Sequence, residues 1–333
     1  MKRRNFVKNI ALAGVGMGTT GLYACAKPGA GDKKEVKSVP SQSNNMFFKL
    51  SIAQWSIHKM IQEDSMDPYE FAAKAKGWGF EGLEYVNHLY QSKLENAGTL
   101  SSGIQTMVTE LNKRKDDQGI ENLIMMVDLP PDEGDMAVVK KAKRKKAIEL
   151  HYPWVDATAG LGCHSMRVNM FGAFDVAEWK SASVEALGVL GEYAAASNVN
   201  IIVENHGWLT SNAALLMEVI EEVGMENVGT LPDFGNFCTK RKNMERWGAC
   251  EEEYDKYQGV AELMPAAKAV SAKSYDFDEN GQTSIDYVKM LQIVKDAGYN
   301  GYIGVEYEGN NLNEEQGILA TKNLLIESAK KVS

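Results

Sequence analysis

The feature of this sequence that most constrains its fold is a repeated alternation of short apolar runs and longer amphipathic stretches, which begins at about residue 47. Eight runs have the length and apolar content of buried strands. The predicted strands are 49–56, 82–86, 122–127, 165–170, 199–204, 228–231, 269–273 and 302–307. Helical periodicity is found between them at 68–77, 175–197, 211–223, 284–297 and 314–331.

Strands that alternate with helices pair in parallel. Eight such repeats, with no dinucleotide-binding glycine fingerprint after the first strand, predict a closed (β/α)8 TIM barrel rather than an open doubly wound sheet. The glycine-rich stretch at 14–18 lies inside a predicted export signal and is not a nucleotide loop. We therefore expect one α/β domain, a barrel formed by residues 47–333, with its functional residues at the carboxyl ends of the strands.

The first residues predict a targeting signal rather than a part of the folded domain. Residues 2–8 (KRRNFVK) form a twin-arginine pattern, followed by an apolar stretch at 10–24 that is too short to span a bilayer. Residues 22–25 (LYAC) resemble a lipobox, so residues 1–25 predict export by the twin-arginine route, to a periplasmic or membrane-anchored lipoprotein. An ordinary cleaved signal with an incidental cysteine is the alternative. Residues 26–46 are rich in Lys, Gly, Pro and Ser and predict a flexible tether.

Net charge excludes one class of partner. The chain has a formal net charge of -9, and its acidic residues are spread along its length. A nucleic-acid-binding protein needs a basic stripe, so nucleic acid is excluded as a partner. The one basic run, at residues 140–146, lies in a helical stretch and predicts a solvated helix face. Contact with a membrane is expected only through the signal or lipid anchor.

The four cysteines are Cys25, Cys163, Cys238 and Cys250. None of them forms a CxxC pair, so neither a zinc ribbon nor a redox motif is indicated. Cys25 is explained by the lipobox. The other three are expected to be free or buried, with a disulfide between Cys238 and Cys250 as the alternative.

Three acidic residues follow or end predicted strands. Glu204 ends the fifth strand, Asp233 comes just after the sixth, and Glu306 lies near the end of the eighth. A carboxylate in such a position is costly to bury unless it is paired or coordinates a metal. Because the carboxyl ends of barrel strands meet at one face, we expect the three groups to share a site.

Four segments carry a family resemblance: VENH at 203–206, PDFGN at 232–236, GVEYE at 304–308 and GFEGLE at 79–84. They resemble the sugar phosphate isomerase/epimerase family of xylose-isomerase-like barrels, over about residues 48–330. The resemblance implies a divalent metal, commonly manganese, held by a Glu, Asp, His and Glu from strands five to eight. It also implies two glutamates that move a proton beside a carbonyl of a sugar.

By position, Glu204, Asp233 and Glu306 match three of these four metal ligands, and Ser271 stands where the family has its histidine. Lys273 points to the same strand face as Ser271, further towards the mouth. Mutual repulsion requires a cation among the carboxylates. Three outcomes stay open: a divalent metal such as Mn2+ or Mg2+, neutralisation by Lys273, or a degenerate site.

The acid and base are predicted to be Glu204 and Glu306, with Lys273 or the metal stabilising an enediolate-like charge.

Five further residues are candidates for contact with the substrate. They are His206 (or a replacement metal ligand), Glu84 (or a structural salt bridge), Trp55 (or core packing), His58 (or a surface loop) and Arg167. The segment at 234–259 has no obvious secondary structure and predicts either a lid or a surface excursion.

The expected partner is a small carbohydrate, unphosphorylated because an exported protein has little access to sugar phosphates. The expected reaction is epimerisation or isomerisation of a sugar or keto-sugar. A 3-keto-glycoside lyase or hydratase and a non-catalytic exported sugar-binding barrel are the alternatives, and assembly into a homo-oligomer stays open. A metal-dependent apurinic endonuclease shares this fold, but the five histidines and the acidic surface argue against it.

Overall fold

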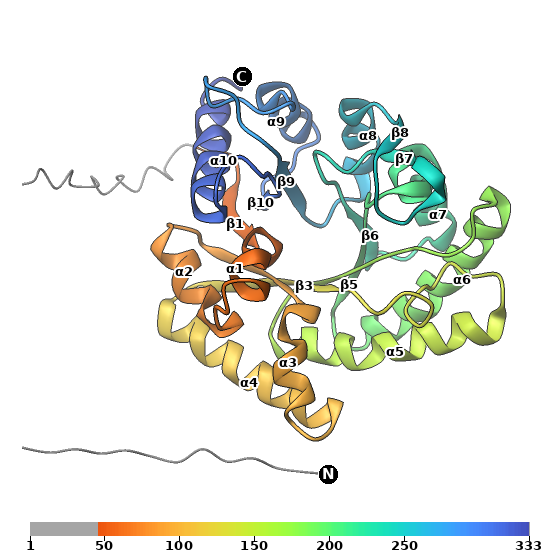
Figure 1. The fold of residues 1–333 in the computed structure, drawn as a ribbon. Coiled ribbons are helices and arrows are strands. Elements are labelled where there is room, and N and C mark those ends of the chain that lie inside the picture. The colour runs from red at the N-terminus through yellow and green to blue at the C-terminus, as the bar shows by residue number, and fades with distance from the viewer. Residues whose placement is uncertain (1–45, 333) are drawn as a thin grey trace, which may run out of the picture. The chain divides into compact units, whose positions relative to one another are not determined.

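The computed structural model describes residues 46–332. The predicted signal and lipobox, and nearly all of the predicted tether, lie outside the described residues. Eight parallel strands form one sheet in the order β6-β5-β4-β3-β2-β1-β10-β9 (Figure 1). The strands are β1 Lys49–Ala53, β2 Gly82–Val86, β3 Glu121–Val127, β4 Ser165–Val168, β5 Asn200–Glu204, β6 Val228–Leu231, β9 Val270–Ser274 and β10 Tyr302–Tyr307.

Two parallel bridges join the ends of this sheet. Thr230 pairs with Ala267, and Asp233 pairs with Ser271. They connect the chain around β6 with the chain around β9, so the sheet closes on itself. The prediction of a single (β/α)8 barrel is therefore confirmed, with all eight predicted strands present and only their ends shifted by a few residues.

Helices pack around the outside of the strands (Figure 1). The side chain of Asp175 accepts the backbone N–H of Glu178 at the start of α6, and Asn212 does the same for Leu215 in α7. Such caps satisfy N–H groups that have no partner inside the helix. The helices are α1 His58–Gln62, α2 Phe71–Gly77, α3 Gln91–Glu95, α4 Leu100–Gln118, α5 Lys141–Gly160, α6 Val176–Ala195, α7 Ala213–Val223, α8 Lys256–Leu263, α9 Tyr287–Asp296 and α10 Glu314–Ala329.

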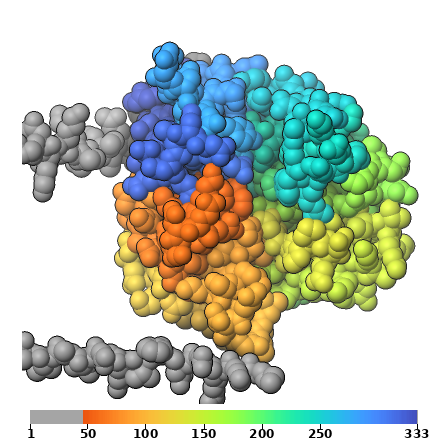
Figure 2. Space-filling model, in the orientation of Figure 1, coloured from red at the N-terminus to blue at the C-terminus, as the bar shows by residue number. Residues whose placement is uncertain are grey.

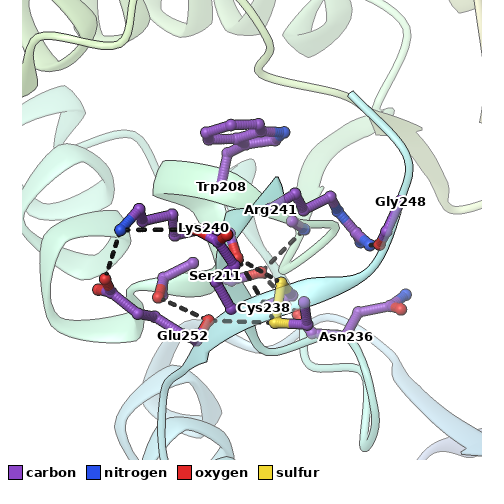
Figure 3. The surroundings of a disulfide bond; sticks show 12 residues. Trp208, Ser211, Asn236, Cys238, Lys240, Arg241, Gly248 and Glu252 are labelled. Atoms are coloured by element: carbon purple, nitrogen blue, oxygen red, sulfur yellow. Dashed lines mark hydrogen bonds and ion pairs between the residues drawn. A yellow bond between two sulfur atoms is a disulfide. The ribbon is translucent and has the colours of Figure 1, made fainter. Parts of the chain in front are cut away.

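The segment after β6 departs from the sequence prediction. Within 234–259 the structure has an antiparallel hairpin, formed by β7 (Cys238–Arg241) and β8 (Cys250–Glu253). A disulfide joins Cys238 to Cys250, with Cα atoms 5.8 Å apart (Figure 3). The prediction that this segment lacks secondary structure was wrong, and the alternative of a disulfide is confirmed. Cys163 is a buried free cysteine.

No helix among residues 46–332 is both long and apolar enough to cross a membrane. The basic run at 140–146 opens α5, as predicted, and its lysines are all exposed while Arg144 is buried.

Candidate active site

The three predicted carboxylates meet at the carboxyl end of the barrel. Glu204 is the last residue of β5, Asp233 lies two residues beyond β6, and Glu306 is the last but one residue of β10. All three are buried, and one carboxylate oxygen from each lies within 4.8 Å of the others. The closure of the sheet produces this cluster, because it brings the loop after β6 against β9 and β10. We call these three residues the carboxylate trio.

Asp233 is held rigidly by the chain around it. Its Oδ1 accepts the backbone N–H groups of Gly235 and Asn236, each at 2.8 Å. The side chain of Asn205 accepts the backbone N–H of Asp233 and donates to its carbonyl oxygen. Gly235 leaves room for Lys273, since a Cβ on Gly235 would lie 2.9 Å from Lys273 Cγ.

Lys273 and Ser271 of β9 complete one side of the trio. The Lys273 ammonium donates to Glu306 Oε1 at 2.6 Å and to Glu308 Oε2 at 2.9 Å. Ser271 Oγ donates to Asp233 Oδ2 at 2.8 Å and lies 3.4 Å from Glu306 Oε2. Lys273 is only 1% exposed. Burial by itself would lower the pKa of Lys273, but the nearby carboxylates raise it well above the ordinary value, so it stays charged.

Arg167 of β4 lies on the other side of the trio. Its Nε is 3.1 Å from Glu204 Oε2, and its Nη1 donates to Asp128 Oδ1 at 2.6 Å. Asn236 donates to the second Glu204 oxygen. Burial raises the pKa of Glu204 to about 7, against the opposing pull of Arg167. Burial likewise raises the pKa of Asp233 to about 8, opposed by Lys273 and reinforced by the other two carboxylates.

A polar network surrounds Arg167 and reaches His206. Asn169 donates to Asp128 and accepts from the ring nitrogen Nδ1 of His206 at 2.7 Å. His206 lies outside the group of convergent ligand atoms, which among the described residues contains the trio alone. The structure thus bonds His206 to Asn169 and does not place it among the ligand atoms of the trio, and its role as a replacement metal ligand stays a prediction. Burial, helped by the charge of Arg167, lowers the pKa of His206 to about 4, so its ring is neutral near pH 7.

Trp55 lies at the mouth and His58 supports it. Trp55 Nε1 donates to Glu308 Oε1 at 2.9 Å, which connects the indole to Lys273 through Glu308. The His58 ring stacks on the indole with centroids 4.1 Å apart. His58 Nδ1 is also bonded to the Trp55 carbonyl oxygen and lies 3.3 Å from Glu314. Trp55 is thus placed to contact a ligand, and His58 packs against the indole and holds it in position.

Glu84 lies deeper in the barrel than the sequence suggested. It is in the middle of β2, and it accepts from Ser51 Oγ at 2.6 Å. A Cβ on Gly304, two residues before Glu306, would lie 2.3 Å from Glu84 Oε1, so the carboxyl fills space that only a glycine leaves. The structure gives Glu84 no ion pair with Lys273 or any other described residue, so the alternative of a structural salt bridge was wrong, and its contact with a substrate stays a prediction. Burial, reinforced by the charges of Glu306 and Glu204, raises the pKa of Glu84 to about 8.

Four site residues were not singled out from the sequence: Asp128, Asn169, Asn236 and Glu308. Asp128, Asn169 and Glu308 each come directly after a strand, at β3, β4 and β10. A polar residue immediately beyond an apolar strand is the signal that would have found them, since that position faces the mouth of a barrel.

The fold and the trio define the class: a TIM-barrel protein with a buried acidic site at the carboxyl ends of its strands. The sequence profile of the xylose isomerase-like TIM barrel family matches residues 72–327. The chain belongs to this family, so the resemblance is confirmed at the level of the xylose-isomerase-like barrel.

Solved structures share the whole barrel at low sequence identity. An L-ribulose 3-epimerase is 16% identical with a TM-score of 0.63, covering 85% of this chain and 96% of its own. A 3-keto-D-glucoside 4-epimerase from E. coli is 14% identical with a TM-score of 0.61, covering 84% and 99%. A xylose isomerase-like barrel protein from Mycobacterium smegmatis, in complex with magnesium, is 13% identical with a TM-score of 0.58, covering 86% and 98%. A search of curated proteins gives no match.

Proposed function

We propose that this protein is a metal-assisted sugar isomerase or epimerase that moves a proton at a carbon beside a carbonyl group. The observation that carries the proposal is the carboxylate trio, in which Glu204 and Glu306 approach one small space from different strands. Membership of the xylose isomerase-like family supports it. Structural similarity to an L-ribulose 3-epimerase and a 3-keto-D-glucoside 4-epimerase points to the same reaction class.

The residues present fit a divalent cation. Three buried carboxylates offer ligand atoms within 4.8 Å of one another, and burial raises the pKa of Glu204 and Asp233, which a bound cation would offset. Ser271 supplies a hydroxyl where relatives have an imidazole, so every candidate ligand atom is an oxygen. Oxygen ligands favour Mg2+ or Mn2+ over zinc. When bound, such an ion would polarise the substrate carbonyl and stabilise negative charge on its oxygen.

The protein's own side chains supply the proton transfers. A carboxylate held beside the reacting carbon can accept a proton as base and return one as acid. We assign Glu204 and Glu306 as this pair: one removes the proton from the carbon, and the other returns a proton to the neighbouring carbon or to the opposite face. Lys273 remains charged beside Glu306 and donates hydrogen bonds where negative charge develops. Trp55 contributes an apolar surface for the sugar ring.

We further propose that the protein acts outside the cytoplasm on an unphosphorylated sugar or keto-sugar. The twin-arginine pattern and lipobox favour a periplasmic or membrane-anchored lipoprotein. The Cys238–Cys250 disulfide supports this location, because disulfides persist in oxidising compartments.

The test is incorporation of solvent deuterium into the substrate, followed by NMR in D2O with Mn2+ removed before detection. The wild-type protein is offered L-ribulose, D-fructose and methyl 3-keto-glucoside. Glu204→Gln and Glu306→Gln are each expected to abolish incorporation while the circular dichroism spectrum is retained. Glu149→Gln, an exposed carboxylate on α5, is the control and retains wild-type incorporation.

Full incorporation in both glutamine variants would refute the assignment of acid and base. Release of methanol from the keto-glucoside, in place of an epimerised product, would instead identify the lyase reaction. Binding without any incorporation would identify a non-catalytic sugar-binding barrel.

A further inference from the structure

An aromatic cluster lies beside the carboxylate trio and has no role in the proton transfer. Trp247, from the loop of the β7–β8 hairpin, has its indole 5.0 Å from the His206 ring and 5.6 Å from the Phe171 ring. Phe171 and His206 are 6.2 Å apart. We call these three residues the aromatic platform. His206 comes two residues after Glu204, so the platform begins at the edge of the site.

The platform is open to solvent at its outer end. Trp247 is 52% exposed. Two guanidinium groups flank the rings, with Arg246 lying 4.5 Å over Phe171 and Arg241 lying 5.5 Å over Trp247. Exposed aromatic rings with polar groups at their margin are typical of a surface that binds a ligand.

Several contacts fix the platform in place. Arg246 forms an ion pair with Asp135, in the segment between β3 and α5. Figure 2 shows the segment of the β7–β8 hairpin next to the segment between β3 and α5. Arg241 Nη1 donates to the Gly248 carbonyl oxygen at 2.7 Å, and the disulfide closes the base of the hairpin (Figure 3). The Trp247 loop is thus held at both ends before any ligand arrives.

Backbone strain gathers at the same place. Trp208 has a φ of 58° and Met244 a φ of 56°, a left-handed conformation that bulky residues rarely adopt. Both residues line a cavity together with Phe171, Phe174 and Arg246. Strain of this kind persists where the surrounding structure enforces it, and it concentrates at ligand clamps.

We propose that the aromatic platform binds a second ring, joined by a glycosidic bond to the sugar that reacts at the trio. The substrate class is therefore a ring-bearing glycoside rather than a free monosaccharide. This inference rests on the proposed function for the location of the reacting sugar. A pyranose or aryl ring presents a flat apolar face to Trp247 or Phe171, while hydroxyl groups at its margin face the arginine side chains.

The experiment is calorimetric titration of the full chain, loaded with Mn2+, with matched glycosides. The probes are methyl, phenyl and glucosyl derivatives of D-glucose in both anomeric forms, the last being maltose and cellobiose. Phenyl or glucosyl derivatives are expected to bind at least about tenfold more tightly than the matched methyl glycoside, the size of one aromatic stacking contact. The phenyl and disaccharide arms show whether an aryl or a sugar ring is preferred.

Trp247→Ala is expected to remove that tenfold preference and to leave the affinity for the methyl glycoside within twofold. The control is Trp78→Ala, since Trp78 bonds to Glu315 of α10 and lies outside the platform. Equal affinity for methyl and ring-bearing glycosides in the wild type would overturn the inference, as would a preference that survives Trp247→Ala. Absence of binding by every probe would also overturn it.

Two readouts separate this inference from the proposed function. A preference for ring-bearing glycosides without deuterium incorporation would support the platform and contradict the proposed proton transfer. Deuterium incorporation without a preference for ring-bearing glycosides would support the proton transfer and contradict the platform. Sedimentation of the wild type and Trp247→Ala shows whether the platform is an interface: a dimer that dissociates in the variant would overturn the inference.

Discussion

Replacement of Lys273 by methionine tests the charge balance of the site most directly. The ammonium is 1% exposed and holds Glu306 at 2.6 Å and Glu308 at 2.9 Å. Removal of one partner from a buried ion pair costs about 3–5 kcal/mol, because the remaining charge is left uncompensated. At a separation of at most 4.8 Å and an effective dielectric constant of about 20, each ionised pair in the trio adds at least about 3.5 kcal/mol of repulsion. Lys273→Met is therefore expected to lose about 3–5 kcal/mol of unfolding free energy without metal.

The assay is urea unfolding of the wild type, Lys273→Met and Lys240→Met, in EDTA and in Mn2+. Lys240 is the control because its pair with Glu252 is exposed, and such pairs contribute about 0–1 kcal/mol. Mn2+ is expected to recover part of the Lys273→Met loss, since the ion supplies the missing charge. If the site binds a metal, Lys273→Met is expected to lose activity moderately. If lysine alone neutralises the site, the same variant is expected to lose nearly all activity. A loss no larger than that of Lys240→Met would refute the reasoning.

Two further predictions concern the interior and the hairpin. Burial raises the pKa of Glu84 from 4.5 to about 8, so its contribution to stability is complete below about pH 4.5 and is lost as the pH rises through 8. Glu84→Gln is therefore expected to lessen, by a few kcal/mol, the fall in unfolding free energy between pH 4.5 and 8. The measurement is urea unfolding in EDTA at several pH values. An unchanged dependence of the unfolding free energy on pH would contradict the prediction. Replacing both Cys238 and Cys250 by alanine opens a loop with a sequence separation of 12, which is worth up to about 3 kcal/mol. Amide hydrogen exchange should quicken in β7 and β8 while deuterium incorporation into the sugar persists; loss of incorporation would show that the hairpin also shapes the trio.

The trio could be predicted because each carboxylate has a local signal. Glu204 ends an apolar strand, Asp233 lies two residues beyond one, and Glu306 is the last but one residue of another. Once the number of repeats implies a closed barrel, equivalent strand ends must meet. The roles of Glu84 and His206 could not be predicted in this way. Whether Glu84 reaches the mouth depends on the stagger of β2 against its neighbours, and the partner of His206 is Asn169, on another strand.

The sequence by itself determined the barrel, its strands and the acidic residues at its mouth, because apolar periodicity and strand-end position are properties of neighbouring residues. Only the tertiary structure decided that Lys273 bonds to Glu306, that Arg167 links Asp128 to Glu204, and that the hairpin brings Trp247 beside His206. These contacts join residues far apart in the chain. Their distances are set by barrel closure, strand stagger and side-chain packing, which no local pattern encodes.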